Sequence, residues 1–299
     1  MIDRERPAIA GSVSVVIPAY NEAHHIVANL QETAEALAEL GAPFEVILVD
    51  DGSSDATWAE AVNGNIIEVR SSGSGRANRL THAQAVQLEN GRPVIRILQY
   101  HNRRGKGHAL ACGSDAAHGD YVVFLDADFD LHPSQLRGLF EILAQENADV
   151  VIGSKLHPDS RVDYPWIRRV MSIGYYYLVR MLFGLPVRDT QTGLKVFKSE
   201  VLRSVLPKVS AEGFAFDVAV LAAAHSFGYK ICEAPITIEA RRRYSRIKIT
   251  DIAFVAKETL AIFYRQRILR TYARPNVERR RYQSQVEMIV RPSDEFVAR

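Results

Sequence analysis

The chain has 299 residues, of which 47% are hydrophobic and 24% are charged, and its formal net charge is +2. This composition excludes general disorder, and the small net charge gives no reason to expect a nucleic-acid partner. Its two cysteines, Cys112 and Cys232, lack a close-spaced partner, which argues against a disulfide framework or a structural zinc site. We expect no signal peptide and no membrane span, because a span needs ~20 uninterrupted apolar residues.

β-branched runs alternate with helical patterns through the first half of the chain. Strands are predicted at 12–17, 44–49, 94–98, 121–125 and 149–153, and helices at 56–62, 105–117 and 133–146. Pro18 is expected to end the first strand, and Asn21 is expected to cap a helix that reaches Leu40. Such alternation implies right-handed crossovers and a mostly parallel sheet covered on both faces, so the fold class is α/β.

The second half continues with fewer regular signals. Helices are predicted at 164–184 and 215–227, and strands near 194–197 and at 230–238. We interpret the polar stretch 63–93 as an excursion from the sheet. The predicted organisation is a tail (1–11), an α/β domain (12–240) and a basic, amphipathic segment (241–299). Apolar residues recur at near-helical spacing over 249–269, which we interpret as a membrane-interface helix, although a core face or a homodimer face would have the same pattern.

Polar residues follow the predicted strands at their carboxyl ends, where open α/β sheets bind ligands. These residues are Tyr20, Glu22, Asp50, Asp51, Asp126 and Asp128. Asp126 and Asp128 come directly after an apolar strand, and Asp130 lies two residues further on. Carboxylates in this spacing suit Mg²⁺ or Mn²⁺, which complete their coordination with water and phosphate oxygens. The alternative is that these aspartates only form a turn or cap a helix.

The run Asn102-Arg-Arg-Gly-Lys-Gly107 precedes a predicted helix. Backbone N–H groups and cations at a helix N-terminus favour phosphate, although a solvated turn would have a similar composition. The run is not a Walker sequence, because no Ser or Thr follows Lys106.

Four motifs occur together in a fixed order: Val15-Val-Ile-Pro-Ala-Tyr-Asn-Glu22, Val49-Asp-Asp-Gly-Ser-Ser-Asp55, Asn102 to Gly107, and Leu125-Asp-Ala-Asp128. In this order they resemble family 2 glycosyltransferases over about residues 12–248. The resemblance implies a GT-A fold, an inverting mechanism and a nucleotide-sugar donor. It also implies a donor-binding set, namely Pro18, Tyr20, Glu22, Asp50, Asp51, Lys106 and Asp126, with Asp128 and Asp130 holding Mg²⁺ or Mn²⁺.

Motifs in the second half resemble the dolichyl- and polyprenyl-phosphate sugar transferases, and the run Arg188-Asp-Thr-Gln-Thr-Gly193 is closer to the glucosyl members. Asp217 stands at the family's usual position for a general base, and Asp189 is the competing carboxylate. A phosphate acceptor is already largely ionised at neutral pH, since its second pKa is ~6, so cations matter more than a base. Arg243 is therefore predicted to be catalytic, and four further cations are predicted to bind acceptor phosphate or diphosphate: Arg241, Arg242, Arg246 and Lys248.

The sequence thus predicts glucose transfer from UDP-glucose to polyprenyl or dolichyl phosphate, by an enzyme peripheral to the cytoplasmic face of a membrane. GDP-mannose as donor, or a saccharide hydroxyl as acceptor, is the nearest alternative. More distant alternatives are a nucleotidyltransferase and a non-catalytic nucleotide-sugar sensor.

Overall fold

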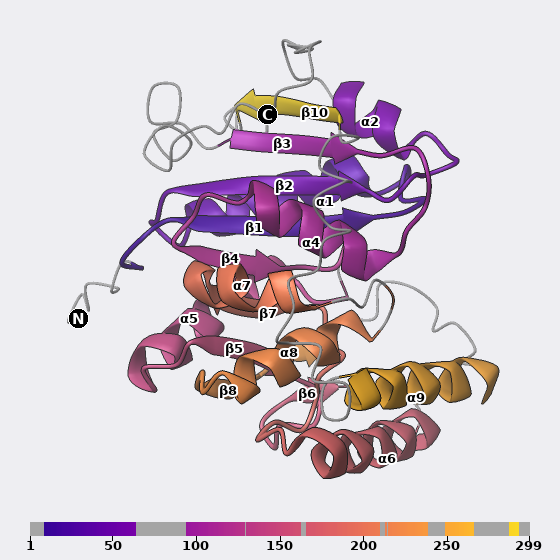
Figure 1. The fold of residues 1–299 in the computed structure, drawn as a ribbon. Helices are drawn as coiled ribbons and strands as arrows, with labels where there is room; N and C mark the ends of the chain where they lie inside the picture. Colours follow the sequence, from indigo (N-terminus) through magenta and orange to yellow (C-terminus); the bar gives the residue numbers. More distant parts are fainter. Residues whose placement is uncertain are drawn as a thin grey trace.

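The computed structural model describes residues 9–63, 94–128, 130–162, 166–209, 213, 215–238, 249–265 and 287–292. Within these ranges, eight strands form one sheet in the order β10-β3-β2-β1-β4-β7-β5-β8 (Figure 1). They are β1 (Val13–Ala19), β2 (Phe44–Asp50), β3 (Val94–Gln99), β4 (Tyr121–Phe124), β5 (Val150–Ser154), β7 (Lys195–Lys198), β8 (Ile231–Pro235) and β10 (Glu287–Pro292). Strands β7 and β10 run antiparallel to their neighbours, and the other pairs are parallel.

Helices cover both faces of the sheet, as the α/β prediction requires (Figure 1). One face packs against α1 (Ile26–Ala38), α2 (Thr57–Asn63) and α5 (Leu136–Gln145). The other face packs against α4 (Lys106–Ala116), α7 (Ser199–Val205) and α8 (Phe216–Ser226). Each face of the sheet carries its own hydrophobic core. Successive side chains of β1 point to opposite faces, so Val15 lies in one core and Val16 in the other.

Two further helices lie side by side away from the central strands (Figure 1). They are α6 (Trp166–Phe183) and α9 (Ile249–Phe263), and the rings of Phe183 and Phe263 meet edge to face with centroids 6.0 Å apart. Among the described residues, no helix is long and apolar enough to cross a bilayer.

Several sequence-based boundaries were wrong. Strand β1 continues through Pro18 to Ala19, because its pairing with β4 stops at Val16↔Phe124 and the sheet needs no N–H from Pro18 on that side. The strand predicted at 230–238 is two strands, β8 and β9 (Thr237–Ile238), and β9 pairs with β6 (Arg161–Val162) in a separate small sheet. Helix α7 was not predicted.

The segment after residue 240 contributes to the main sheet, since β10 pairs with β3 at its edge. The division into a tail, a catalytic domain and a C-terminal segment stays a prediction. The predicted excursion at 63–93 lies almost wholly outside the described residues.

Candidate functional site

The carboxyl edge of the parallel strands gathers the polar motifs in one place. Strands β1 and β2 end in register at Ala19↔Asp50, and β3 ends beside them at Gln99. Because β7 is antiparallel, its first residue, Lys195, lies at the same edge as the last residue of β4. The loop before β7, residues 188–194, which we call the site loop, is thus placed beside Asp126.

Asp50 is fully buried at the end of β2 and its carboxylate is held by three donors. Oδ1 accepts from the Ser53 backbone N–H at 3.0 Å and from the Ser53 hydroxyl, while Oδ2 accepts from Gln99 Nε2 at 3.0 Å. The next turn passes Gly52, whose φ is +66° and whose missing side chain leaves room for the backbone of Arg103. The Arg103 guanidinium lies 3.9 Å from the centroid of the Tyr20 ring. These contacts join the ends of β1, β2 and β3 into one rigid group.

Asn21 links two loops and does not cap a helix, which corrects the prediction. Its φ is +58°, in the left-handed region that asparagine tolerates. Its backbone N–H donates to Ser53 Oγ at 3.0 Å, and its Oδ1 accepts from the Ser54 N–H at 2.9 Å. Helix α1 begins only at Ile26, and the N–H of Glu22 donates to Thr57 Oγ1 at 2.7 Å. The loop bearing Tyr20 and Glu22 is therefore fixed against the loop after β2.

The carboxylate of Asp51 is committed to backbone groups. It accepts from the N–H of Arg104 at 2.7 Å and from the N–H of Gly105 at 2.8 Å. These residues lead directly into α4, which begins at Lys106. Asp51 therefore orients the start of α4, and with it the side chain of Lys106.

Lys106 and Asp126 form an ion pair at 2.5 Å between the first turn of α4 and the end of β4. Burial alone would lower the pKa of Lys106, but Asp126 and Asp217 raise it above its ordinary value. Burial alone would raise the pKa of Asp126, but Lys106 holds it below its ordinary value. Both groups therefore stay charged at neutral pH.

Asp128 is the most crowded carboxylate of the group. Burial, together with the negative charges of Asp126 and Asp130, raises its pKa to about 6. A divalent cation between Asp128 and Asp130 would offset this repulsion, so the donor set fits the predicted Mg²⁺ or Mn²⁺. In the described ranges, no three His, Cys, Asp or Glu residues converge as a complete metal site. Two carboxylates are enough for a cation whose other ligands are water and phosphate.

Asp189 organises the site loop. Its carboxylate accepts from the Lys155 N–H at 3.0 Å, the Gln191 N–H at 3.0 Å and the Thr192 hydroxyl at 2.6 Å. Burial alone would raise the pKa of Asp189, but the Lys155 ammonium, 3.5 Å away, and these hydrogen bonds hold it below its ordinary value. This geometry suits a residue that holds the loop better than one that takes up a proton.

Lys195 is a site residue that the sequence reasoning missed. Its ammonium lies 2.6 Å from Asp217 Oδ1, and the two side chains are 1% and 6% exposed. Burial lowers the pKa of Lys195, and Asp217 offsets only part of this shift. The available signal was its place two residues after Gly193, just beyond the run Arg188 to Gly193.

Arg243, which is predicted to be catalytic, and the predicted acceptor-binding cations lie outside the described residues. The latter are Arg241, Arg242, Arg246 and Lys248. Their roles stay predictions.

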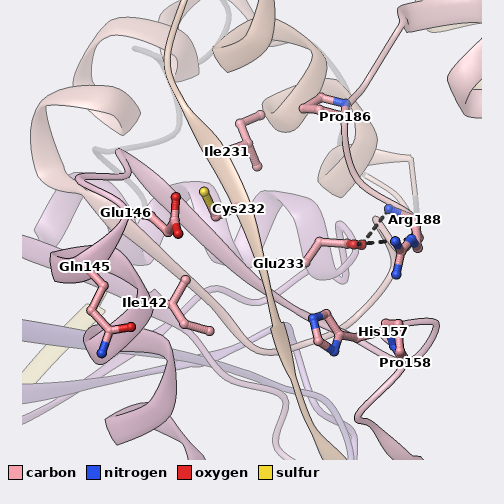
Figure 2. Close-up of a pocket in the computed structure, with 10 residues that line it drawn as sticks. All are labelled: Ile142, Gln145, Glu146, His157, Pro158, Pro186, Arg188, Ile231, Cys232 and Glu233. Carbon is pink, nitrogen blue, oxygen red and sulfur yellow. Dashed lines mark hydrogen bonds and ion pairs between the residues drawn. The ribbon is translucent and has the colours of Figure 1, made fainter.

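A separate pocket of about 410 Å³ lies beside the edge strand β8. Its lining includes Ile142 from α5, His157, and Arg188 and Glu233, which are in contact with each other (Figure 2). None of the predicted donor or metal residues lines it. Glu233 Oε1 nevertheless accepts from the N–H groups of Arg188 at 2.5 Å and Asp189 at 3.2 Å, so this side of β8 supports the site loop from behind.

The chain resembles known proteins along most of its length. It is 29% identical over 283 residues to the glycosyltransferase AglD of Haloferax volcanii, which covers 92% of this chain and 40% of that protein. It is 27% identical over 247 residues to the dolichyl-phosphate beta-glucosyltransferase of Dictyostelium discoideum, covering 79% of this chain and 69% of that protein. It is 29% identical over 240 residues to the dolichyl-phosphate beta-glucosyltransferase of Saccharomyces cerevisiae, covering 75% of this chain and 66% of that protein. The chain therefore spans two fifths to about two thirds of these relatives.

Solved structures identify the fold. Glucosyl-3-phosphoglycerate synthase from Mycobacterium tuberculosis, in complex with Mn²⁺, UDP and phosphoglyceric acid, superposes with a TM-score of 0.57 at 21% identity. The match covers 90% of this chain and 81% of that one. The fold is thus of the GT-A class, as the resemblance implied. A model of glycosyl transferase family 2 matches residues 14–77 and 73–206, which is more than half of the sequence, and the chain belongs to this family.

Proposed function

We propose that this protein is an inverting glycosyltransferase that transfers glucose from UDP-glucose to a polyprenyl or dolichyl phosphate. The observation that carries the proposal is the crowding of Asp128 by Asp126 and Asp130 beside Lys106. Such a group favours a divalent cation together with a diphosphate. The names of the dolichyl-phosphate beta-glucosyltransferases support glucose and a lipid phosphate as the substrates.

The donor lies along the carboxyl edge in this proposal. Asp50 accepts from the base, and Pro18, Tyr20 and Glu22 line the nucleoside pocket. Lys106 and Asp126 contact the diphosphate side, and Asp51 keeps the start of α4 in place. Bound Mg²⁺ or Mn²⁺, held by Asp128 and Asp130, would neutralise charge that develops on the leaving nucleoside diphosphate.

The acceptor phosphate attacks the anomeric carbon from the face opposite the diphosphate. A phosphate oxygen forms the new bond to carbon, the bond to the diphosphate oxygen breaks, and the diphosphate leaves with the electron pair. The dianionic acceptor carries no proton to remove, so the step depends on cations more than on a base. Arg241, Arg242, Arg243, Arg246 and Lys248 are the proposed cations.

Contact with the cytoplasmic face of a membrane completes the proposal. Helix α6 exposes five large apolar side chains at spacings of three and four residues: Trp166, Val170, Ile173, Tyr177 and Met181. The same helix contains arginines and no acidic residue, which suits anionic lipid. On its inner side, Tyr175 contacts Gln191 of the site loop at 3.3 Å and Thr259 of α9 at 2.9 Å. A membrane on this face would bring lipid phosphates close to the site loop.

The test is transfer of labelled sugar to polyprenyl phosphate in detergent, from UDP-glucose and separately from GDP-mannose. Chelator-sensitive glycolipid from UDP-glucose is expected, and Asp128→Ala should form none. Asp159→Ala is the matched control, because its carboxylate is 80% exposed and lies 3.7 Å from His157, which is not a predicted site residue. Product from GDP-mannose alone would reassign the donor. Absence of glycolipid with nucleotide-sugar binding intact would favour a saccharide acceptor or a sensor.

A further inference from the structure

The buried pair Lys195–Asp217 joins three parts of the site. Lys195 begins β7, and Asp217 lies in the first turn of α8. The Lys195 ammonium also donates to the backbone carbonyl of Thr192 in the site loop. A buried ammonium is costly unless it is paired and hydrogen-bonded, so Asp217 and Thr192 together account for its position.

The residue after Thr192 lies against the donor side of the site. A Cβ placed on Gly193 would overlap the carboxylate of Asp126, so backbone and carboxylate are in direct contact. Asp126 in turn pairs with Lys106 at 2.5 Å. A shift of Thr192 would therefore move the support beneath Asp126.

The start of the site loop is fixed independently. Glu233 accepts from the N–H groups of Arg188 and Asp189, and Asp189 binds Gln191 and Thr192. Among the described residues, two charged side chains hold Thr192, near the end of the site loop. Asp189 accepts from its hydroxyl, and Lys195 donates to its carbonyl. Loss of Lys195 would remove the bond to the Thr192 carbonyl, next to the glycine that touches Asp126, and would leave Thr192 held by its hydroxyl bond to Asp189.

We propose that Lys195 is a positioning residue for sugar transfer, and that Asp217 serves as its counter-ion and not as a general base. The pair holds Thr192 and Gly193 under Asp126, so that Asp126 and Lys106 meet the donor in a fixed arrangement. Lys195 bonds one oxygen of Asp217, and proton uptake on either oxygen would cancel the negative charge that balances the buried ammonium. This inference rests on the proposed function, in which a phosphate acceptor brings no proton that must be removed.

The test compares Lys195→Met, Asp217→Asn and the double variant Lys195→Met/Asp217→Leu with wild type. Lys198→Met is the matched control, because Lys198 lies on the same strand and pairs with Asp149 at 2.8 Å near the surface. For each variant we would measure kcat, the KM for the nucleotide sugar, the pH profile of kcat/KM, and the rise in Tm caused by UDP with Mn²⁺. The Tm without ligand shows whether each variant folds.

Lys195→Met is expected to raise the donor KM at least tenfold and to reduce the rise in Tm caused by UDP. Asp217→Asn should keep kcat within about tenfold of wild type and retain the acid limb of the pH profile. The double variant should be more stable and more active than Lys195→Met, because the unpaired carboxylate is gone.

Two results would overturn the inference. One is loss of kcat and of the acid limb in Asp217→Asn at unchanged donor KM, which is the behaviour of a base. The other is a Lys195→Met variant that matches Lys198→Met in every measurement. A wild-type protein that binds UDP but transfers no sugar would instead contradict the proposed function, and the Tm series would still test the positioning role.

Discussion

The carboxylate of Asp126 rests on the backbone of Gly193, with no room for a side chain between them. Asp126 follows β4 and Gly193 precedes β7, and these two strands are antiparallel neighbours. The contact therefore fixes the site loop and the Asp126 carboxylate relative to each other. It also explains why the residue before Leu194 must be glycine.

Gly193→Ala is expected to reduce sugar transfer at least tenfold, because the added methyl group must displace the Asp126 carboxylate from Lys106. Gly138→Ala is the control, since nothing lies within 4 Å of a Cβ at that position in helix α5. That substitution should leave activity unchanged and stabilise the fold by up to ~1 kcal/mol. Steady-state kinetics and thermal melts of both variants measure the effect, and equal activities would contradict the steric argument.

Asp51→Asn should weaken donor binding without removing the proposed metal ligands, Asp128 and Asp130. The variant keeps the shape of the side chain but loses the charge that accepts from Arg104 and Gly105 at the start of α4. A loss of about 1–3 kcal/mol in the free energy of unfolding is expected, with a several-fold weaker Kd for UDP. Urea unfolding and calorimetric titration measure the two quantities. Unchanged UDP affinity would mean that the position of α4 does not depend on Asp51.

The buried ion pair of Glu45 and Arg96 predicts how the stability of the protein depends on pH. Glu45 lies near the start of β2, at the end of the strand away from the candidate site. Burial would raise the pKa of Glu45, but hydrogen bonds from His118 and Ser14 and the charge of Arg96 hold it below its ordinary value. A carboxyl group with a lowered folded-state pKa contributes stability above its unfolded pKa of ~4.3, and this is lost as pH falls through the folded value. Wild type should therefore lose stability below about pH 4.5 more steeply than Glu45→Gln.

The substitution Glu45→Gln should also cost roughly 3–5 kcal/mol at pH 7, because Arg96 stays buried without its counter-charge. Glu146→Gln is the control, since the ion pair of Glu146 with Lys230 is exposed at the surface. That change should cost less than about 1 kcal/mol. Denaturant titrations at pH 7 and between pH 3 and 5 separate the two cases. Parallel pH curves for wild type and Glu45→Gln would contradict the linkage.

The apolar face of α6 predicts binding to vesicles that contain anionic lipid. Trp166 and Met181 are 72% and 75% exposed, and burying one such side chain contributes about 1.5–3 kcal/mol. Trp166→Ser and Met181→Ser should each reduce vesicle partitioning roughly tenfold or more, by that burial energy. Phe227→Ser is the control, because Phe227 is 43% exposed at the end of α8. Flotation assays measure the partitioning, and equal losses in all three variants would exclude a specific role for α6.

The sequence predicted the elements whose signals are local. The apolar runs that became β2 and β4 and the polar residues after them were identified correctly, because burial of a parallel strand leaves a continuous hydrophobic pattern. Asn21 was misread because a left-handed asparagine and an N-cap have the same composition cue. The ion pair of Lys195 with Asp217 spans 22 residues, and no local pattern distinguishes an inward lysine from an exposed one.

Strand β10 was missed for a related reason. Its six residues carry too weak a pattern for a strand, and its partner β3 lies almost two hundred residues earlier in the chain. Only the assembled sheet provides the edge on which such a segment forms regular structure.

Strand β10 also covers an edge of the sheet that could otherwise pair with another chain. Without β10, the backbone N–H and C=O groups along one side of β3 would be free to pair with an extended segment of another chain. Strand β3 carries buried apolar side chains on both faces, which would favour such pairing. An antiparallel segment from the far end of the polypeptide occupies that edge instead. A chain that ends before Glu287 is thus expected to aggregate edge to edge through β3, even though every residue of the candidate site would still be present.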